Sequence, residues 1–425
     1  MSEYTNLLKQ TLEKNGQTYV DHLAELVNAE TQVIGHGIKG GHEENGQKVV
    51  ERLLSEMGAD SIEKDQMDEA VIQKAIKEHQ EGNPGHNYDG RYNVYATFKG
   101  TGKGRSLLFN GHVDTMPYGD KSLWNTDPLK ATIIDGNMYG VGACDMKAGL
   151  MASICAVKLL KDAGLTVPGD VTITSVCDEE GGGNGSIQAA MRGLKADGVV
   201  VCEPSTRLVR TAHSGFIFFK VEVEGLACHS GSKWEGVSAI EKAIKIINAL
   251  NELEHEWLLK YHHPYQPAPN GNVGVIEGGT AGSTVANYCC FNTCVHYMPG
   301  QTHSQMVKEY TDCINRVADA DPWLCEHRPK VSIYQAGGAF EVNRDSDFVQ
   351  SFCGAFEQAT GEKAVMAGVT GGNDSRVWKN IAGCDTLHFG PGDLGGCHII
   401  NEHVPVADYL EAILVYAEMI LDWCK

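Results

Sequence analysis

Short apolar runs rich in β-branched residues alternate along this chain with longer amphipathic patterns of helical period, and this alternation constrains the fold most. Val171–Val176 and Gly198–Val201 have the pattern of strands, and Met146–Leu160 has the pattern of an amphipathic helix. Strands that alternate with helices form parallel sheets covered by helices on both faces. The sequence therefore predicts an α/β fold with a mostly parallel, doubly wound sheet.

The order of the expected elements changes between residues 215 and 335. They are a strand over Ile217–Glu224, a helix over Val237–Glu252, strands near Gly274 and over Tyr288–Tyr297, a helix over Ser304–Ala318 and a strand over Lys330–Tyr334. This βαββαβ order is typical of a two-layer inserted domain. Because 425 residues exceed what one hydrophobic core usually serves, we expect a catalytic domain from residues 1–214 and 336–425, interrupted by a second domain at 215–335.

Composition excludes several classes of partner. The 55 Asp and Glu residues outnumber the 35 Lys and Arg residues, and no basic cluster stands out, so a nucleic-acid ligand is not expected. No apolar run is long enough to span a membrane, and no basic segment followed by an apolar one opens the chain. Fourteen cysteines without a CxxC pair indicate reduced thiols. We therefore expect a cytoplasmic protein with no membrane partner.

Acidic and imidazole side chains follow the carboxyl ends of the expected strands. In chain order they are His112 and Asp114, Asp145 at the start of a helix, Glu179 and Glu180, Glu203, and finally His398. Carboxyl ends of parallel strands meet at one edge of a sheet, and zinc prefers imidazole and carboxylate ligands. The sequence therefore predicts a metal centre at this edge.

The adjacent carboxylates Glu179 and Glu180 allow a division of labour. Neighbouring side chains at a strand end point in different directions, so one carboxylate could bind metal while the other acts as general base. Taken alone, the pair is also compatible with a solvated turn. Its place between the other strand-end groups favours the catalytic interpretation.

Several motifs together resemble a family of co-catalytic zinc hydrolases that includes acetylornithine deacetylase, succinyl-diaminopimelate desuccinylase, aminoacylase and glutamate carboxypeptidase. The motifs are Gly111–Pro117, Gly140–Lys147, Asp178–Glu180, Cys202–Ser205, Ala227–Gly231 and Gly390–Glu402. The resemblance covers essentially the whole chain. It departs from the family at Val141, where relatives usually carry Arg, and at Ala286–Asn287, where they usually read Pro-Asp.

The resemblance implies a role for each site residue. It implies two zinc ions per subunit, which Co²⁺ or Mn²⁺ could replace, one held by His112, Asp145 and Glu203, the other by Asp145, Glu180 and His398. It further implies that Asp114 orients His112, Glu179 is the general base, His229 stabilises the oxyanion from a dimer partner, and Asn373 and Arg376 bind the substrate. It also implies a cis peptide bond between Asp145 and Met146.

The activity that the resemblance implies is hydrolysis of an amide bond. The expected reaction is removal of an acyl group from an N-acyl amino acid or similar small carboxylate, as in acetylornithine deacetylase. A metallo-dipeptidase or carboxypeptidase with the same di-zinc centre is the alternative, and a catalytically silent binding protein is less favoured because all six metal-centre residues are present. The partner is expected to be a small N-acyl amino acid or a peptide. The resemblance also implies a homodimer formed through residues 215–335, which would serve as lid and dimerisation domain.

A glycine-rich segment near the N-terminus matches a nucleotide-binding pattern only in part. Gly35–Gly40 fits the GxGxxG pattern of dinucleotide-binding proteins, but it follows the expected end of a helix and not a strand. The pattern therefore lacks the strand–turn–helix context that a pyrophosphate site needs. We interpret the segment as a turn.

Overall fold

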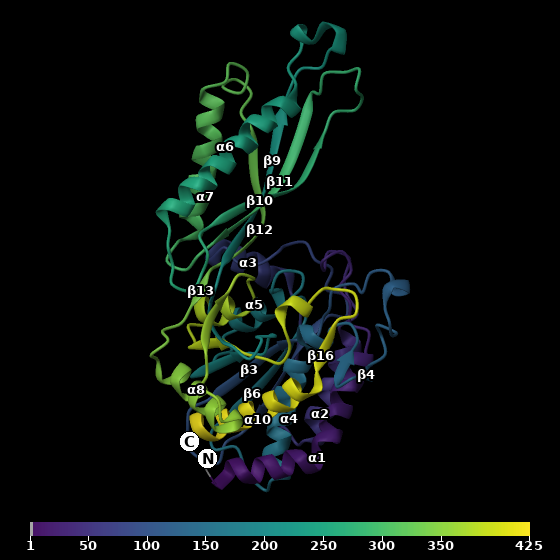
Figure 1. The fold of residues 1–425 in the computed structure, drawn as a ribbon, viewed down its shortest axis with the longest axis vertical. Helices are drawn as coiled ribbons and strands as arrows, with labels where there is room; N and C mark the ends of the chain where they lie inside the picture. The colour runs from purple at the N-terminus through teal and green to yellow at the C-terminus, as the bar shows by residue number, and fades with distance from the viewer. Residues whose placement is uncertain (1–2) are drawn as a thin grey trace. The chain divides into compact units, whose positions relative to one another are not determined.

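The structure is a computed structural model that describes residues 3–425. The chain forms two compact units, each described here by itself (Figure 1). Unit 1 contains the chain up to Thr211 together with Glu341–Gly368 and Asn373–Lys425, and unit 2 contains Ala212–Phe340 and Val369–Gly372.

Unit 1 is built on a nine-stranded sheet whose four central strands are parallel. Across the sheet these are β6 (Val171–Val176), β3 (Leu107–His112), β7 (Gly198–Val201) and β15 (Thr386–His388). Antiparallel strands flank this core, with β2 pairing to β6 and β8 pairing to β15. The outer strands are β1 (Ser61–Gln66), β2 (Tyr92–Phe98), β8 (Val209–His213), β13 (Phe340–Glu341) and β14 (Met366–Val369). The parallel core aligns four carboxyl ends at one edge.

Helices cover both faces of this sheet (Figure 1). Successive strand residues point to opposite faces: Phe109 packs on Tyr416 with ring centroids 4.9 Å apart, whereas its neighbour Leu108 clusters with Trp378. The helices on the Phe109 side are α1 (Glu3–Asn28), α2 (Glu44–Glu56), α4 (Ala148–Asp162), α8 (Asp347–Thr360) and α10 (Val406–Trp423). Those on the Leu108 side are α3 (Glu69–His79), α5 (Asn184–Met191) and α9 (Ser375–Asn380).

A small antiparallel sheet in unit 1 joins distant parts of the chain. Its strands are β4 (Thr132–Ile134), β5 (Asn137–Tyr139) and β16 (His403–Pro405), in the order β16-β5-β4. Pairing of β16 with β5 brings Glu402 next to the loop that follows β5, and Gly140 N–H donates to the Glu402 carbonyl at 3.2 Å. This contact positions the segment that carries Asp145.

Unit 2 is a two-layer domain with one four-stranded antiparallel sheet. Its elements are, in chain order, β9 (Gly215–Glu224), α6 (Ala239–Lys260), β10 (Asn270–Gly278), β11 (Tyr288–Tyr297), α7 (His303–Asp319) and β12 (Lys330–Gly337). The strand order is β10-β11-β9-β12, so β10 and β12 are the edges. Alternate residues of β9 are buried beneath the helices, and Phe219 stacks on Tyr310 of α7 at a centroid distance of 4.0 Å.

Polar side chains cap the helices at their first turns. Ser238 accepts a hydrogen bond from the Glu241 N–H at the start of α6, and Thr302 accepts one from the Gln305 N–H at the start of α7. Each hydroxyl satisfies a backbone donor that has no partner within the helix. Local sequence therefore defines where these helices begin.

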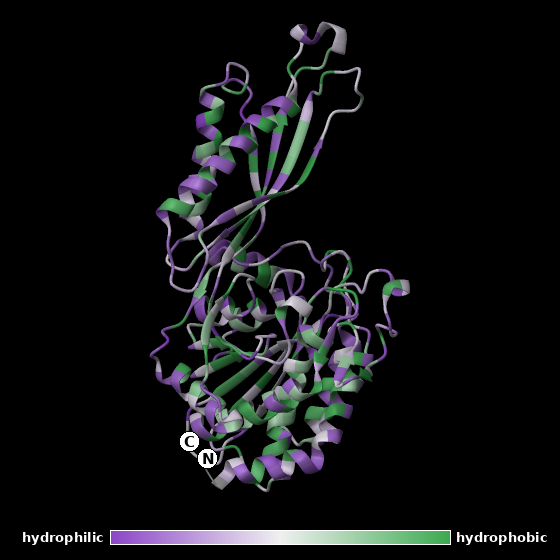
Figure 2. Cartoon of the chain, in the orientation of Figure 1, coloured by the Kyte–Doolittle hydropathy of each residue, from purple (hydrophilic) through white to green (hydrophobic). Residues whose placement is uncertain are grey.

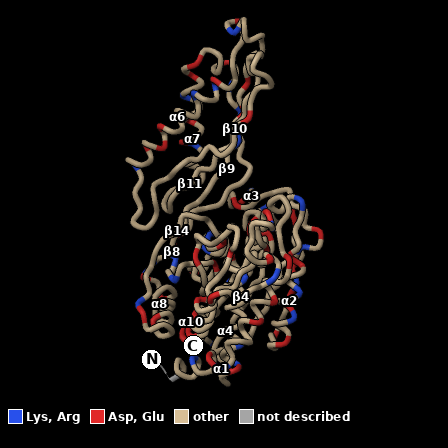
Figure 3. The backbone as a smooth tube through the Cα atoms, turned by 45° about the vertical axis from the view of Figure 1, so that its right-hand side comes forward, with Lys and Arg blue, Asp and Glu red and all other residues tan. Residues whose placement is uncertain are grey.

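Apolar residues concentrate in the strands of the unit 1 sheet (Figure 2). Acidic residues are spread over helices of both units, interspersed with basic ones (Figure 3). Within residues 3–425, no helix is both long and apolar enough to cross a membrane. The fourteen cysteines are all free thiols.

The predicted fold class is confirmed: a mostly parallel sheet lies between helices, and unit 2 has the βαββαβ order. Residues 59–91 have no predicted element, whereas the structure has β1 and α3 there. The antiparallel strands β2 and β8 were not predicted either. The antiparallel strands outside the parallel core follow no βα alternation, so the pattern that revealed the core was absent there.

Candidate functional site

The candidate site forms where the four parallel strands of unit 1 end. β3 ends at His112, β6 is followed by Glu179 and Glu180, and β7 is followed by Glu203. His398 comes from the turn after β15. The carboxyl ends of neighbouring parallel strands lie at the same edge, so residues distant in sequence converge there.

Asp145 reaches this edge from the loop before α4. The Asp145–Met146 peptide bond is cis, as the resemblance implied. The buried Glu402 carboxylate accepts hydrogen bonds from the N–H groups of Gly142, Cys144 and Asp145, each at 3.0 Å. Three backbone donors on one carboxylate fix the course of this loop.

The structure brings the six predicted metal-centre residues except Glu179 into two groups that share Asp145. One group is His112, Asp145 and Glu203, the other is Asp145, Glu180 and His398, and the potential ligand atoms within each lie within 4.8 Å of one another. His112 Nε2 is 3.2 Å from Asp145 Oδ1, and His398 Nε2 is 3.2 Å from Asp145 Oδ2. The two carboxylate oxygens of Asp145 thus face different imidazoles, as a bridging ligand requires.

Buried carboxylates outnumber cationic groups in this cluster. Burial raises the pKa of Glu203 well above its usual value, and the Asp145 carboxylate raises it further. Hydrogen bonds to Asp145 and Glu180 raise the pKa of His398 to about 11. Concentrated negative charge with oxygen and imidazole donors suits a divalent cation, which would take the place of protons on the histidines. The residues present therefore fit a metal centre.

Glu179 lies beside the two groups without joining either. Its Oε2 is 4.0 Å from His112 Nε2. Burial raises the pKa of Glu179 well above its usual value, and the neighbouring Asp374 carboxylate raises it further. Asp374 is itself buried and accepts a 2.5 Å hydrogen bond from Ser186 Oγ. A carboxyl group with a raised pKa is able to accept and return a proton near neutral pH.

Asp114 contacts both sides of the site. The His112 Nδ1–H donates to the Asp114 backbone carbonyl at 2.9 Å, while the Asp114 carboxylate is 3.7 Å from the same nitrogen. That carboxylate accepts hydrogen bonds from the N–H of Glu179 at 3.3 Å and of Glu180 at 3.0 Å. Asp114 therefore orients the imidazole through its backbone and the Glu179–Glu180 segment through its side chain.

A buried network lies directly behind this segment. Arg91 Nη2 donates to Asp178 Oδ1 at 2.8 Å, and Arg91 Nε donates to Glu43 at 2.9 Å. His86 Nδ1 is 2.7 Å from Asp178 Oδ2. Asp178 has a φ of +62°, a left-handed conformation that is uncommon outside glycine. Because Asp178 immediately precedes Glu179, these contacts hold the start of the loop that carries both glutamates.

Asn373 and Arg376 lie in unit 1 with their polar atoms engaged by protein groups. Asn373 Nδ2 donates to His388 Nδ1 at 2.8 Å, and Asn373 Oδ1 accepts from the Ser375 N–H at 3.0 Å. Arg376 is 1% exposed and pairs with the buried Glu81 at 3.0 Å. Their contact with a substrate carboxylate stays a prediction, and it would require one of these partners to be displaced.

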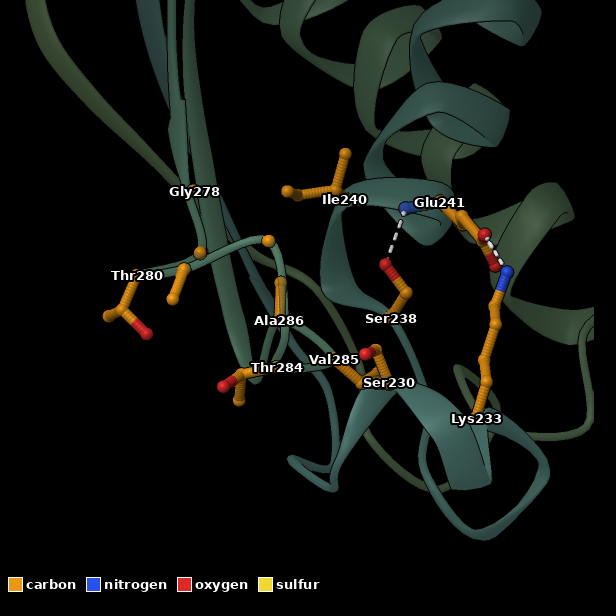
Figure 4. A pocket seen from close by; sticks show the side chains of 13 residues that line it. Ser230, Lys233, Ser238, Ile240, Glu241, Gly278, Thr280, Thr284, Val285 and Ala286 are labelled. Atoms are coloured by element: carbon orange, nitrogen blue, oxygen red, sulfur yellow. Dashed lines mark hydrogen bonds and ion pairs between the residues drawn. The ribbon is translucent and has the colours of Figure 1, made fainter.

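His229 belongs to unit 2, where it is exposed and precedes a short helical turn, Ser230–Glu235. Its Nδ1 accepts a hydrogen bond from the Gly231 N–H at 3.1 Å, which leaves Nε2 as the protonated nitrogen. A pocket of about 560 Å³ lies beside it, bounded by Ser230, Thr284 and the glycine-rich turn after β10 (Figure 4). The Lys233–Glu241 ion pair lies at its rim. A donor at Nε2 is suited to stabilising an anionic oxygen.

Several residues that hold the site in place could not be identified from the sequence. Glu402 was noticed only as part of a motif, and Glu81, His86 and Arg91 lie in a stretch that had no assignment. The one available signal was the adjacency of Glu402 to the His398 motif. The other three contact the site through partners about 90 to 295 residues away, which no local pattern reveals.

Comparisons with known proteins agree with this geometry. The model of Peptidase family M20/M25/M40 matches residues 108–422. The chain is 32% identical over 367 residues to an N-formyl-4-amino-5-aminomethyl-2-methylpyrimidine deformylase from Bacillus subtilis. The aligned region covers 80% of this chain and 84% of that protein. The chain is 28% identical over 327 residues to an acetylornithine deacetylase from Yersinia pestis, with 75% and 79% covered.

A metallo-carboxypeptidase of the M20 family from Sulfolobus solfataricus has a similar fold, with a TM-score of 0.74 at 17% identity over 95% of this chain and 99% of that one. These matches confirm the resemblance seen in the motifs. The chain belongs to Peptidase family M20/M25/M40 and is a metallohydrolase that acts on amide bonds.

Proposed function

We propose that this enzyme removes a small acyl group from the nitrogen of a small-molecule amide, using two divalent cations, zinc in the first instance with Co²⁺ or Mn²⁺ as substitutes. His112, Asp145 and Glu203 would hold one cation, and Asp145, Glu180 and His398 the other. The observation that carries the proposal is the pair of ligand groups sharing Asp145, with Glu179 beside them.

Side chains of the protein supply the proton transfer and the stabilisation of the oxyanion. When bound, the cations would polarise the amide carbonyl and lower the pKa of a water. Glu179 takes a proton from the attacking water and returns it to the leaving nitrogen, a role that typically contributes about 10² to 10⁴ in rate. Asp114 holds the Glu179 backbone for this purpose, and the Nε2–H of His229 stabilises the oxyanion.

Two substrate classes are consistent with the relatives. Acetylornithine deacetylase relatives favour an N-acyl amino acid or similar small carboxylate. The deformylase relatives, at 32% and 34% identity, favour an N-formyl amine on a heteroaromatic ring, a substrate whose name contains no carboxylate. We retain both, because the catalytic chemistry is the same and only the leaving amine differs.

A substrate panel tests the proposal. N-formyl, N-acetyl and N-succinyl amino acids, an N-formyl aminomethylpyrimidine and unmodified dipeptides should be compared with zinc-loaded enzyme. Hydrolysis of an N-acyl substrate ahead of every dipeptide is the expected result. Faster hydrolysis of dipeptides would favour the peptidase alternative, and no hydrolysis of any substrate would favour a binding protein.

We further propose a homodimer formed through residues 215–335, with His229 acting in the partner's site. Support comes from β10, an edge strand with exposed Val275 and Ile276, and from exposed Leu258 and Leu259 on α6. An open edge strand with apolar residues is a common site of association.

Mixing two inactive chains tests the homodimer and the trans role together. A His229→Ala chain mixed with a Glu179→Ala chain should regain part of the activity, because one site of a mixed dimer has both groups intact. A monomer by light scattering, or no rescue despite subunit exchange, would contradict the proposal.

A cytoplasmic location is the last part of the proposal. Fourteen free thiols in the described chain support it, since oxidising compartments favour disulfides. Fractionation of cells that produce the protein would check it, with recovery outside the cytoplasm as the contrary result.

A further inference from the structure

We propose that Arg376 is a positioning residue for the loop that carries Glu179 and Glu180, and that Glu81 holds it in that role. This inference rests on the proposed amidohydrolase function. It gives Arg376 a task other than contact with a substrate carboxylate, and it adds a residue, Glu81, from a part of the chain with no assigned role.

The guanidinium of Arg376 is engaged on three sides by the protein. Nε donates to Glu81 Oε2 at 3.0 Å, Nη1 donates to the Asn373 carbonyl at 2.7 Å, and Nη2 donates to the Gly182 carbonyl at 2.9 Å. Both members of the ion pair are buried, with Arg376 1% and Glu81 2% exposed. A planar fork of donors that is satisfied in this way fixes the relative positions of its acceptors.

One of those acceptors belongs to the catalytic loop. The Gly182 N–H and the Gly183 N–H both donate to the Glu179 carbonyl, at 2.7 Å and 2.8 Å. Gly183 has a φ of +83°, and a Cβ there would lie 2.6 Å from Arg376 Nη2. The guanidinium therefore packs directly on the turn that closes behind Glu179, and it leaves no room for a side chain at position 183.

The same loop is held from its other end by Asp114, whose carboxylate accepts the N–H groups of Glu179 and Glu180. Arg376 and Asp114 thus bind successive parts of one short segment. A shift at Gly182 is transmitted to the general base and to the metal ligand beside it, because only Gly181 separates Glu180 from Gly182. Displacements of about 1 Å at a catalytic group cost as much as 10²-fold in rate.

The buried Glu81–Arg376 pair joins two distant stretches of the chain. Removing a carboxylate and a guanidinium from water is costly, and a buried pair is weak support for stability by itself. Glu81 lies in the stretch between α3 and β2, 295 residues from its partner. The pair ties that stretch to the loop through Arg376, which makes the geometry of the loop the function that the pair serves.

Kinetics of two variants on two substrates distinguish positioning from substrate contact. Arg376→Lys and Glu81→Gln should be compared on an N-acyl amino acid and on its C-terminal amide. Positioning predicts that kcat falls roughly tenfold or more in both variants and on both substrates, with KM little changed. Substrate contact predicts a rise in KM for the free carboxylate alone, in Arg376→Lys alone.

Cation binding gives a second readout that needs no substrate. Both variants should weaken Co²⁺ or Zn²⁺ binding roughly tenfold in competition with a chromophoric chelator, because Glu180 moves with the loop. Arg192→Lys is the matched control, since Arg192 pairs with the buried Asp65 at 2.8 Å at the end of α5. Arg192→Lys should change neither kcat nor the affinity for the cation. Circular dichroism checks that each variant folds. If Arg376→Lys does not fold, the kinetics and cation binding of Glu81→Gln alone decide the outcome.

Unchanged kcat and unchanged cation affinity in Glu81→Gln would overturn the inference, and so would a KM effect confined to the free carboxylate. A wild-type enzyme that hydrolyses none of the N-acyl substrates would instead overturn the proposed function. In that case the cation titration still decides whether Glu81 and Arg376 position the loop.

Discussion

The buried carboxylates of the unit 1 site and the half-buried Glu309 of unit 2 differ in how their charge is compensated. In unit 1, burial and neighbouring carboxylates raise the pKa values of Glu179 and Glu203. In unit 2, burial opposes ionisation of Glu309, but hydrogen bonds from Tyr261, Lys260, Gln305 and Trp257 lower its pKa to about 2. The unit 1 carboxylates have too few cationic partners for their number, whereas the Glu309 carboxylate of unit 2 has its hydrogen-bond donors within the protein.

This difference separates a functional site from a structural one. The Glu309 carboxylate joins α7 to the end of α6 and is satisfied by four donors. The unit 1 cluster has imidazoles and backbone N–H groups but too few cations for its carboxylates. A protein that keeps such a deficit at the ends of parallel strands is suited to take up cations from solution.

The largest expected effect is that of removing the cations. Chelation should reduce turnover at least 10³-fold and lower the melting temperature, because bound cations offset the repulsion among the unit 1 carboxylates and stabilise the folded state by mass action. Zn²⁺ should restore both. If a chelated sample that is free of metal by elemental analysis stays active, the unit 1 carboxylates do not serve to bind cations, and their difference from Glu309 has no functional meaning.

A smaller effect is expected from Glu402→Gln. Glu402 accepts hydrogen bonds from three backbone N–H groups and holds the Asp145 loop, but, unlike Glu309, its pKa is raised by burial to about 7. An amide would direct an NH₂ group at one of those donors, so metal affinity should fall about 10- to 100-fold. Competition titration measures this. Glu411→Gln is the control, because Glu411 lies on α10 and pairs with Arg207, away from the Asp145 loop.

The smallest effect is expected in unit 2, from Glu309→Gln. At pH 7 the variant should lose on the order of 1–2 kcal/mol in free energy of unfolding, measured by urea titration with tryptophan fluorescence, and its turnover should be close to that of wild type. Since the folded-state pKa is lowered to about 2, the stabilisation is present above about pH 4.5 and is lost as the pH falls towards 2.

The difference in free energy of unfolding between wild type and Glu309→Gln should therefore become smaller below pH 4.5. Asp312→Asn is the control, because Asp312 makes an exposed pair with Lys308 on the same helix that should contribute no more than about 0.5 kcal/mol. A difference that becomes larger as the pH falls would show that Glu309 is not the compensated carboxylate described here.

Much of the unit 1 core and most residues of the candidate metal centre could be predicted from sequence for one physical reason. Parallel strands buried on both faces leave short runs of apolar and β-branched residues such as Gly198–Val201, and most candidate ligands follow such runs in the sequence. The βαββαβ order of unit 2 was visible for a related reason, because strands and helices there differ clearly in period.

The remainder depends on contacts that local sequence does not encode. The antiparallel strands β1 and β2 carry mixed polar and apolar residues, so no apolar run marked them out. The partners of Arg376 were hidden because Glu81 lies 295 residues away and a buried guanidinium looks, in sequence, like one available to a ligand. Burial and partner identity are properties of the folded chain.

The most direct test compares Glu179→Gln with Glu180→Gln, two adjacent residues given different tasks. Metal content by elemental analysis and turnover on an N-acyl substrate should be measured on the same samples. Glu179→Gln should retain the metal content of wild type while turnover falls about 10² to 10⁴-fold, and Glu180→Gln should lose metal as well as turnover. Equal metal loss in both variants, or wild-type turnover in Glu179→Gln, would contradict a metal centre with Glu179 as its general base.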